Sequence, residues 1–384
     1  MKKILSVLTT TSILLLIAAC TNPPPPLSPP QSSATPSAQE PTPEPTPTTQ
    51  PEEEAVEDHD HNDDHHDHEE DSDHDHEPDE DEHNVQEDAE AEPVEHGEDG
   101  HSHILVEPEM IGGVMINAFN QFELVSVTSD DEYVYISHPT GLPTHPMMTG
   151  ITNWQQQVPI PQDYTGQNSW AIPLNPVFTD NGLSTTETSF RGAIAVAVNG
   201  IPIFTAVNNR GEDAFEIGEL DEWGGHSGRA DDYHYHIPPV HLEEIVGKGQ
   251  PIAYAFDGFP IYGETNAELD EHFGIQNEDG SYQYHTVLSQ SPYFIPSFRG
   301  EVNYVGDEIS PQARTFGVRP ATNPLRGTLE ITNFEAAGEN GYSLTYVFDG
   351  SSYIVNYGWD DSGLYTYEFV NPDGSSTVET YQKR

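Results

Sequence analysis

The sequence predicts a mostly β protein, with an antiparallel sandwich or barrel-like domain that has long loops and few short helices, behind a disordered N-terminal third. From residue 104 on, short apolar runs are separated by turn pairs such as Asn199-Gly200 and Asp349-Gly350. This spacing is typical of antiparallel sheets. The preceding hundred residues are rich in proline and acids and show no apolar period. Such a composition does not bury enough apolar surface to fold.

Composition divides the chain into four segments. Residues 1–19 read as a signal peptide, and residues 20–50 as a disordered stalk rich in proline and threonine. Residues 51–103 form an acidic, histidine-rich disordered run. Residues 104–384 form the β-rich domain, with its main motifs in 115–300 and further strands in 301–384.

The leader combines Lys2 and Lys3 with an apolar run from residue 4 to residue 17. It has the charged, apolar and small-residue regions of a secretory signal. The tetrapeptide Ile17-Ala18-Ala19-Cys20 resembles the lipobox of bacterial lipoproteins. That resemblance implies lipidation of Cys20 and a place in the cell envelope, on the extracytoplasmic side of an outer membrane or at the cell surface. An ordinary signal peptide is the alternative.

The formal net charge of −54 argues against nucleic acid as a partner and favours metal cations. Residues 51–103 contain no lysine or arginine, and almost every other polar position is acidic. Imidazoles among carboxylates suit zinc, copper or nickel, so this run is predicted to collect metal ions. A purely solvating linker is the alternative. The histidines of the run are His59, His61, His65, His66, His68, His74, His76, His83, His96, His101 and His103.

Strands and short helices are expected at defined places in the β-rich domain. Short helices are predicted at 240–246 and 267–273, a loop at 141–146, and irregular chain at 154–176. Pro202 and Pro260 lack an N–H and predict that their strands lie at sheet edges. The expected strands are 122–127, 133–136, 193–198, 201–204, 252–256, 259–262, 342–348, 351–357, 364–370 and 375–381.

Two of the predicted hairpins are alike. Residues 195–204 read Ala-Val-Ala-Val-Asn-Gly-Ile-Pro-Ile-Phe, and residues 253–262 read Ala-Tyr-Ala-Phe-Asp-Gly-Phe-Pro-Ile-Tyr. The alternating alanines allow close packing on one face. Their flanking sequences do not support a duplication, so we interpret them as two solutions of one packing problem, with an internal duplication as the alternative.

The richest chemistry lies between Gly224 and Pro239. His234 and His236 alternate with tyrosines, so in an extended chain both imidazoles lie on one face. Paired imidazoles on a strand suit zinc or copper, with His226 as a third ligand. Hydrogen-bonded structural histidines are the alternative. The residues proposed to complete the site are Asp232, Asp257, His145 and His285.

These motifs resemble the YHYH domain family over about residues 115–300. The resemblance rests on the stretches 218–221, 224–236 and 257–263, the loop at 141–146, and the segments 282–285, 292–294 and 299–300. It implies an exported bacterial protein and no established activity. Two departures stand out: Glu222-Trp223 and Val240-His241 replace cysteines found in many members, and Gln283 replaces a histidine. We therefore do not expect a symmetric site with two equal halves.

The predicted function is an extracytoplasmic lipoprotein whose domain binds zinc or copper. A metal-dependent hydrolase with Asp257 or Glu264 as general base is one alternative. A polysaccharide-binding surface built from tyrosines and tryptophans is another. Arg229 is expected either to pair with Asp231 or Asp232 or to receive an anionic ligand. The expected partners are metal ions and, through the lipid anchor, a membrane.

Overall fold

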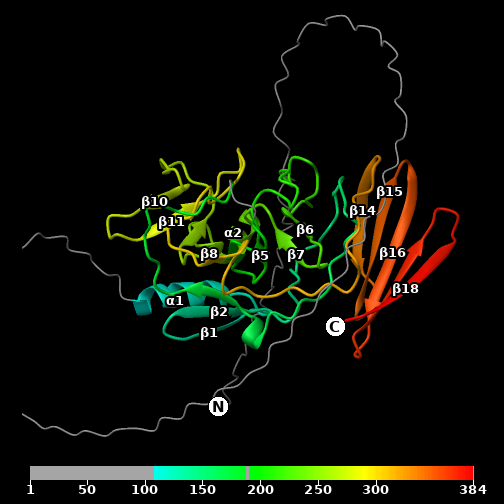
Figure 1. Ribbon diagram of the computed structural model, residues 1–384, viewed down its shortest axis with the longest axis horizontal. Coiled ribbons are helices and arrows are strands. Elements are labelled where there is room, and N and C mark those ends of the chain that lie inside the picture. Colours follow the sequence, from blue (N-terminus) through cyan, green and yellow to red (C-terminus); the bar gives the residue numbers. More distant parts are fainter. Residues whose placement is uncertain (1–107, 187–189, 384) are drawn as a thin grey trace, which may run out of the picture. The chain divides into compact units, whose positions relative to one another are not determined.

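The computed structural model describes residues 108–186 and 190–383, and the mostly β class is confirmed (Figure 1). The leader, Cys20, the proline-rich stalk and the histidine-rich run lie outside the described residues. Within those residues, no helix has both the length and the apolar character needed to span a bilayer. The strands form sheets of three, eight, two and five strands.

The first sheet follows a helix that the sequence did not predict. Helix α1 spans Pro108–Phe119, and β1 (Ser126–Ser129), β2 (Tyr133–Ser137) and β3 (Trp170–Pro173) form an antiparallel sheet. Val134 and Ile136 of β2 are fully buried, which gives the expected alternation. The predicted strand at 122–127 starts later, at residue 126. β3, preceded by the 3-10 turn η1 (Gly166–Asn168), lies inside the stretch that was expected to be irregular.

The eight-stranded sheet holds the predicted histidine motif. Its spatial order is β10-β11-β9-β8-β4-β5-β7-β6. Neighbours pair antiparallel except β5 with β7 and β9 with β11, which pair parallel. The strands are β4 (Ala195–Ala197), β5 (Pro202–Ile203), β6 (Gly225–Ser227), β7 (Tyr233–Tyr235), β8 (Ala253–Ala255), β9 (Pro260–Tyr262), β10 (Gly274–Gln276) and β11 (Tyr282–His285).

The placement of the two proline strands corrects one prediction. β5 lies between β4 and β7, and β9 lies between β8 and β11, so neither strand is an edge. Pro202 and Pro260 each stand at the first position of the strand, where a missing N–H is tolerated. In β5 the next inter-strand bond is donated by the N–H of Phe204 to the carbonyl of Tyr235.

One of the two predicted helices exists. Residues 240–246 form the 3-10 turn η2 (Val240–Leu242) and the single helical turn α2 (Glu243–Val246). Residues 267–273 are not helical. The carboxylate of Asp270 accepts hydrogen bonds from the N–H groups of His272 and Gly274, and such local bonds compete with a helix.

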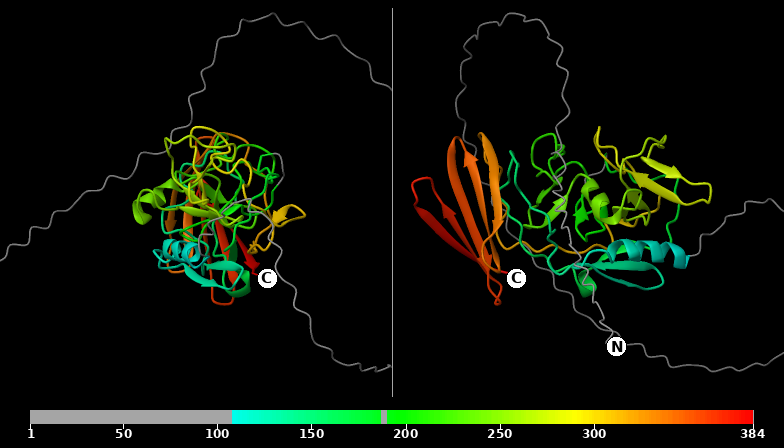
Figure 2. Two further views of the ribbon diagram at one scale, coloured as in Figure 1. Left: turned by 90° about the vertical axis from the view of Figure 1, so that its left-hand side faces the viewer. Right: turned by 180° about the vertical axis from the view of Figure 1, so that it is seen from behind.

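The C-terminal strands form a five-stranded antiparallel meander in sequence order, seen as one twisted layer in Figures 1 and 2. Across its polar face, Ser343 donates to the side-chain oxygen of Asn356, whose amide donates to Glu368. Its strands are β14 (Leu329–Ala336), β15 (Gly341–Phe348), β16 (Ser351–Trp359), β17 (Leu364–Val370) and β18 (Ser376–Gln382). β14 was not predicted. The small pair β12 (Tyr304–Val305) and β13 (Glu308–Ile309) precedes the meander.

A buried ion pair connects the meander with the loop between β6 and β7. The Arg319 guanidinium lies 3.1 Å from the carboxylate of Asp231, and the two side chains are 6% and 1% exposed. The same guanidinium lies over the ring of Tyr367, 4.8 Å from its centre. Burial raises the pKa of Asp231, and the nearby guanidinium acts in the opposite direction. The two groups therefore depend on each other to remain charged.

We predict that Arg319→Met lowers the free energy of unfolding by about 3 to 5 kcal/mol, because it leaves the Asp231 carboxylate buried without its cation. Urea unfolding measures the change. The matched control is Arg314→Met. Arg314 pairs with Glu308 at 2.6 Å, but its side chain is 61% exposed, so this change should lower stability by less than about 1 kcal/mol. Equal losses in the two variants would contradict the prediction.

Candidate metal centre

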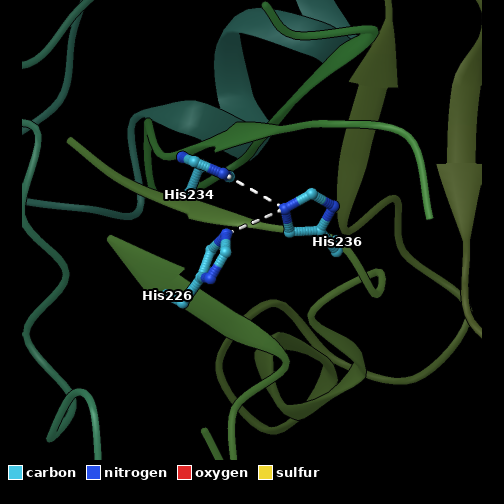
Figure 3. Close-up of side chains that lie close together, drawn as sticks. All are labelled: His226, His234 and His236. Atoms are coloured by element: carbon cyan, nitrogen blue, oxygen red, sulfur yellow. Dashed lines mark hydrogen bonds between the residues drawn. The ribbon is translucent and has the colours of Figure 1, made fainter. Parts of the chain in front are cut away.

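The hairpin of β6 and β7 brings three histidines together. His226 on β6 lies directly opposite His234 on β7, and His236 follows two residues later on the same face. The hairpin is closed by Asp231 at φ 56°, with a backbone bond from the N–H of Gly228 to the carbonyl of Asp232. Figure 3 shows the three rings pointing toward one another from the neighbouring strands.

The three rings meet through their Nε2 atoms. The Nε2 of His236 lies 3.2 Å from that of His234 and 3.1 Å from that of His226. The ligand atoms of all three lie within 4.8 Å of one another. The residues are 3–8% exposed, so little water reaches the group. Among residues 108–186 and 190–383, no fourth His, Cys, Asp or Glu joins this cluster.

The opposite side of each ring is held by hydrogen bonds. The Nδ1 of His236 lies 2.5 Å from the carbonyl oxygen of Thr205. The Nδ1 of His234 lies 3.2 Å from the carbonyl oxygen of Asp232 and 3.1 Å from its carboxylate. A carbonyl oxygen only accepts, so Nδ1 carries the proton in both rings. The His226 ring is held by the backbone of Glu219.

This proton placement leaves two lone pairs in contact. A neutral imidazole has one N–H, so with Nδ1 protonated the Nε2 atoms of His234 and His236 are both acceptors. Two acceptors 3.2 Å apart repel each other unless a positive species lies between them. A proton or a metal cation at the centre of the cluster would remove this repulsion.

A proton is disfavoured there. Burial, with the neighbouring His234, lowers the pKa of His236 to about 3. Burial also lowers the pKa of His226 well below its ordinary value, and the other two imidazoles and the Arg210 guanidinium lower it further. Neutral imidazoles with bare Nε2 atoms are the form that binds a transition metal.

Two of the three nitrogen–nitrogen distances fit such an ion. Zinc–imidazole bonds of 2.0–2.1 Å at a tetrahedral angle place the nitrogens ~3.3 Å apart, close to the 3.1 and 3.2 Å found here. The contact of Asp232 with the outer nitrogen of His234 is the carboxylate–histidine arrangement common around bound zinc. Phe204 stacks on His234 with ring centres 3.9 Å apart and fixes the plane of that ring.

The other predicted site residues have different partners. The Asp257 carboxylate accepts from the Tyr284 hydroxyl at 2.5 Å and from the N–H of Gly300 at 2.9 Å. His285 bonds through Nδ1 to the carbonyl of Gly263 at 2.9 Å and through Nε2 to Gln283 at 2.8 Å. Asp232 is the one additional predicted residue that contacts the histidine cluster.

His145 lies against the other face of β7. Its Nδ1 donates to the carbonyl of Pro146, so its Nε2 accepts from the Tyr235 hydroxyl at 2.7 Å. The ring stacks on Trp223 at 4.9 Å, and His241 packs edge-on against both rings. Burial lowers the pKa of His145 to about 4 and that of His241 to about 3. Both rings are therefore neutral near pH 7.

Arg229 takes neither acid as its ion-pair partner. Its residue is exposed, whereas Asp231 pairs with Arg319 and Asp232 with His234. Sequence reasoning also missed the groups that orient the cluster, namely the carbonyl of Thr205, the ring of Phe204 and the backbone of Glu219. A backbone carbonyl cannot be recognised from the type of its residue. Only the length of the hairpin that ends at Phe204 indicated where the carbonyl of Thr205 lies.

Comparison with known proteins supports the resemblance found in the sequence. Residues 169–310 match the family model described as YHYH protein, and this range contains the three histidines and the entire eight-stranded sheet. No curated protein and no solved structure gives a significant match to the chain. The predicted resemblance is therefore confirmed over residues 169–310, and the chemistry must be argued from the site itself.

We predict that His241→Phe weakens the acid sensitivity of the fold. The unfolded chain binds a proton at His241 near pH 6.5, but the folded protein binds it only near pH 3. The free energy of unfolding therefore falls as pH drops between these values, by at most about 1.4 kcal/mol per pH unit for this group. Urea unfolding in the presence of a chelator, at pH 6.5 and at pH 4.5, measures this effect. Between these two pH values the variant should lose less free energy of unfolding than the parent does. An unchanged loss would contradict the prediction.

Proposed function

We propose that this chain, which matches the YHYH protein family model over residues 169–310, binds one transition-metal ion, zinc or copper, through His226, His234 and His236. The observation that carries the proposal is the 3.2 Å contact between two imidazole nitrogens whose protons lie on the opposite side of each ring. A cation with three imidazole ligands removes the repulsion and satisfies all three Nε2 atoms.

The cellular setting follows from the N-terminal sequence. We propose a lipoprotein that is anchored through Cys20 on the extracytoplasmic side of an envelope membrane, with the domain held away from it by the proline-rich stalk. Residues 51–103, with their eleven histidines among acids, would raise the local concentration of metal ions beside the domain. In this view the tail collects ions at many weak sites and the buried cluster holds one ion tightly.

Metal-dependent hydrolysis is the second candidate, and one observation favours it. The described residues supply three ligands, and catalytic zinc sites in proteins have three protein ligands with the fourth position left for water or substrate. Three neutral imidazoles leave the full charge of the ion to act on a bound water. Asp257 is a poor general base for this reaction because its carboxylate is occupied by Tyr284 and Gly300.

A polysaccharide-binding surface receives less support. Trp154 and Trp170 are 4% and 1% exposed and belong to the core. Trp223 packs against His145 and His241, and Trp359 against Tyr365. These rings are used in packing within the described part of the chain.

We predict that a chain starting at residue 104 retains one zinc or copper ion per molecule after dialysis, and that His236→Ala abolishes this retention. His236 touches both other rings, so its loss removes the central ligand. His285→Ala is the matched control, because His285 is also a buried histidine, lies at the end of β11 and bonds to Gln283 instead. Elemental analysis gives the counts. A chain that holds no ion and gains none from added zinc or copper refutes the proposed function.

A second prediction concerns the carboxylate beside His234. Asp232→Asn should weaken metal binding about 10- to 100-fold, because the carboxylate orients the imidazole and increases its basicity. Asp279→Asn is the control, since Asp279 lies in the β10–β11 hairpin and caps Ser281 in solvent. Competition with a chromogenic chelator measures both affinities. Equal affinities for the two variants would show that Asp232 does not support the site.

A further inference from the structure

The strand order of the eight-stranded sheet repeats about its centre. Read outward from the middle, one half runs β4-β5-β7-β6 and the other runs β8-β9-β11-β10. Each half consists of two consecutive hairpins, and in each the last strand of the second hairpin pairs parallel with the return strand of the first. The halves meet where β4 and β8 pair antiparallel, with Ala195 opposite Ala255 and Ala197 opposite Ala253.

The register is the same in both halves. Ile203 pairs with Tyr235 in the first half, and Ile261 pairs with Tyr284 in the second. The second hairpins also match: His226 lies opposite His234, and Ile275 lies opposite Gln283. His236 and His285 therefore occupy the same position.

The anchoring hydrogen bonds repeat as well. The Asp221 carboxylate accepts from the N–H of Gly225 at 3.1 Å and from the Tyr233 hydroxyl at 2.8 Å. In the second half, Asp270 accepts from the N–H of Gly274 at 2.9 Å and from the Tyr282 hydroxyl at 2.9 Å. These carboxylates begin the two hairpins at equivalent places, although the surrounding sequences differ.

The outward bond of the histidine is also conserved between the halves. His236 bonds through Nδ1 to the carbonyl of Thr205, the residue after Phe204. His285 bonds through Nδ1 to the carbonyl of Gly263, the residue after Tyr262. The two halves thus match in structure beyond the first hairpins, which favours the internal duplication that was the alternative interpretation of these hairpins.

We infer that the sheet consists of two copies of one four-stranded unit, and that the second copy holds a latent transition-metal site at Ile275, Gln283 and His285. These positions are equivalent to His226, His234 and His236 by strand register. The inference rests on the proposed function for the chemistry of the first site. The second unit differs from a three-histidine cluster at only two side chains, Ile275 and Gln283.

The second unit satisfies its histidine without a cation. The Gln283 amide nitrogen donates to the Nε2 of His285 at 2.8 Å, and the amide oxygen of Gln283 accepts from Asn277 at 3.3 Å. An amide supplies the N–H that a second imidazole, protonated on its outer nitrogen, does not supply. The same backbone arrangement therefore holds a neutral hydrogen-bonded pair, Gln283 and His285, in the second unit. In the first unit it holds the histidine cluster, which a cation would satisfy.

The test is the double variant Ile275→His/Gln283→His in the full chain. Both proteins are loaded with zinc and dialysed against a weak chelator. Elemental analysis should then show one more tightly held zinc ion per molecule in the double variant than in the parent. The histidine-rich tail contributes equally to both proteins and cancels in the difference. Adding Ser281→Asp, which places a carboxylate where the first unit has Asp232, should tighten the new site about 10- to 100-fold.

The reverse exchange tests the equivalence of the units without relying on a new site. His226→Ile/His234→Gln gives the first unit the side chains of the second. It should fold in the presence of EDTA, with a circular dichroism spectrum like that of the parent, and lose the ion of the first site. An unfolded reverse variant would overturn the equivalence.

The outcomes separate this inference from the proposed function. With ions counted beyond those held by the histidine-rich tail, one ion in the parent and two in the double variant support both. By the same count, no ion in the parent and one in the double variant supports the latent site and refutes the proposed function for the native cluster. No gain in a double variant that keeps the parent's circular dichroism spectrum and thermal midpoint in EDTA overturns the latent site.

Discussion

The outward hydrogen bonds of the imidazoles decide what the histidine cluster can do. A carbonyl oxygen at Nδ1 fixes the proton on the outer nitrogen and leaves the inner nitrogen bare. Because the rings are buried, solvent does not relieve the contact between bare nitrogens. Every other feature of the site, from the Phe204 ring to the Asp232 carboxylate, holds the rings in this arrangement. Metal binding is the chemistry that such a constraint favours.

The sheet supplies that constraint through its topology. The parallel pairing of β5 with β7 brings the end of the first hairpin beside the end of the second, and so places Thr205 next to His236. The Asp221 carboxylate holds the start of the β6–β7 hairpin through four donors, which are the Tyr233 hydroxyl and the N–H groups of Met148, Trp223 and Gly225. The tyrosines on the opposite face of β7 therefore position the histidines indirectly, because they fix the strand that carries His234 and His236.

The second unit shows how little separates a buried histidine cluster suited to a metal from an ordinary hydrogen-bond network. Both units share strand register, anchoring aspartate and the outward bond of the histidine. They differ at two positions: Ile275 stands where the first unit has His226, and Gln283 stands where it has His234. Gln283 donates a hydrogen bond to the neighbouring histidine, which His234 does not, and so the second unit satisfies that histidine without a cation.

The sequence by itself determined the β class, the C-terminal hairpins and the pair His234 and His236 on one face, because turn residues and two-residue alternation act locally. It also proposed His226, which the structure places opposite His234. Only the tertiary structure decided that β5 and β9 are interior, that His145 and Asp257 have other partners, and that the two units are equivalent. Those facts depend on the pairing of distant strands and on backbone carbonyls such as that of Thr205, and neither is encoded by residue type at a single position.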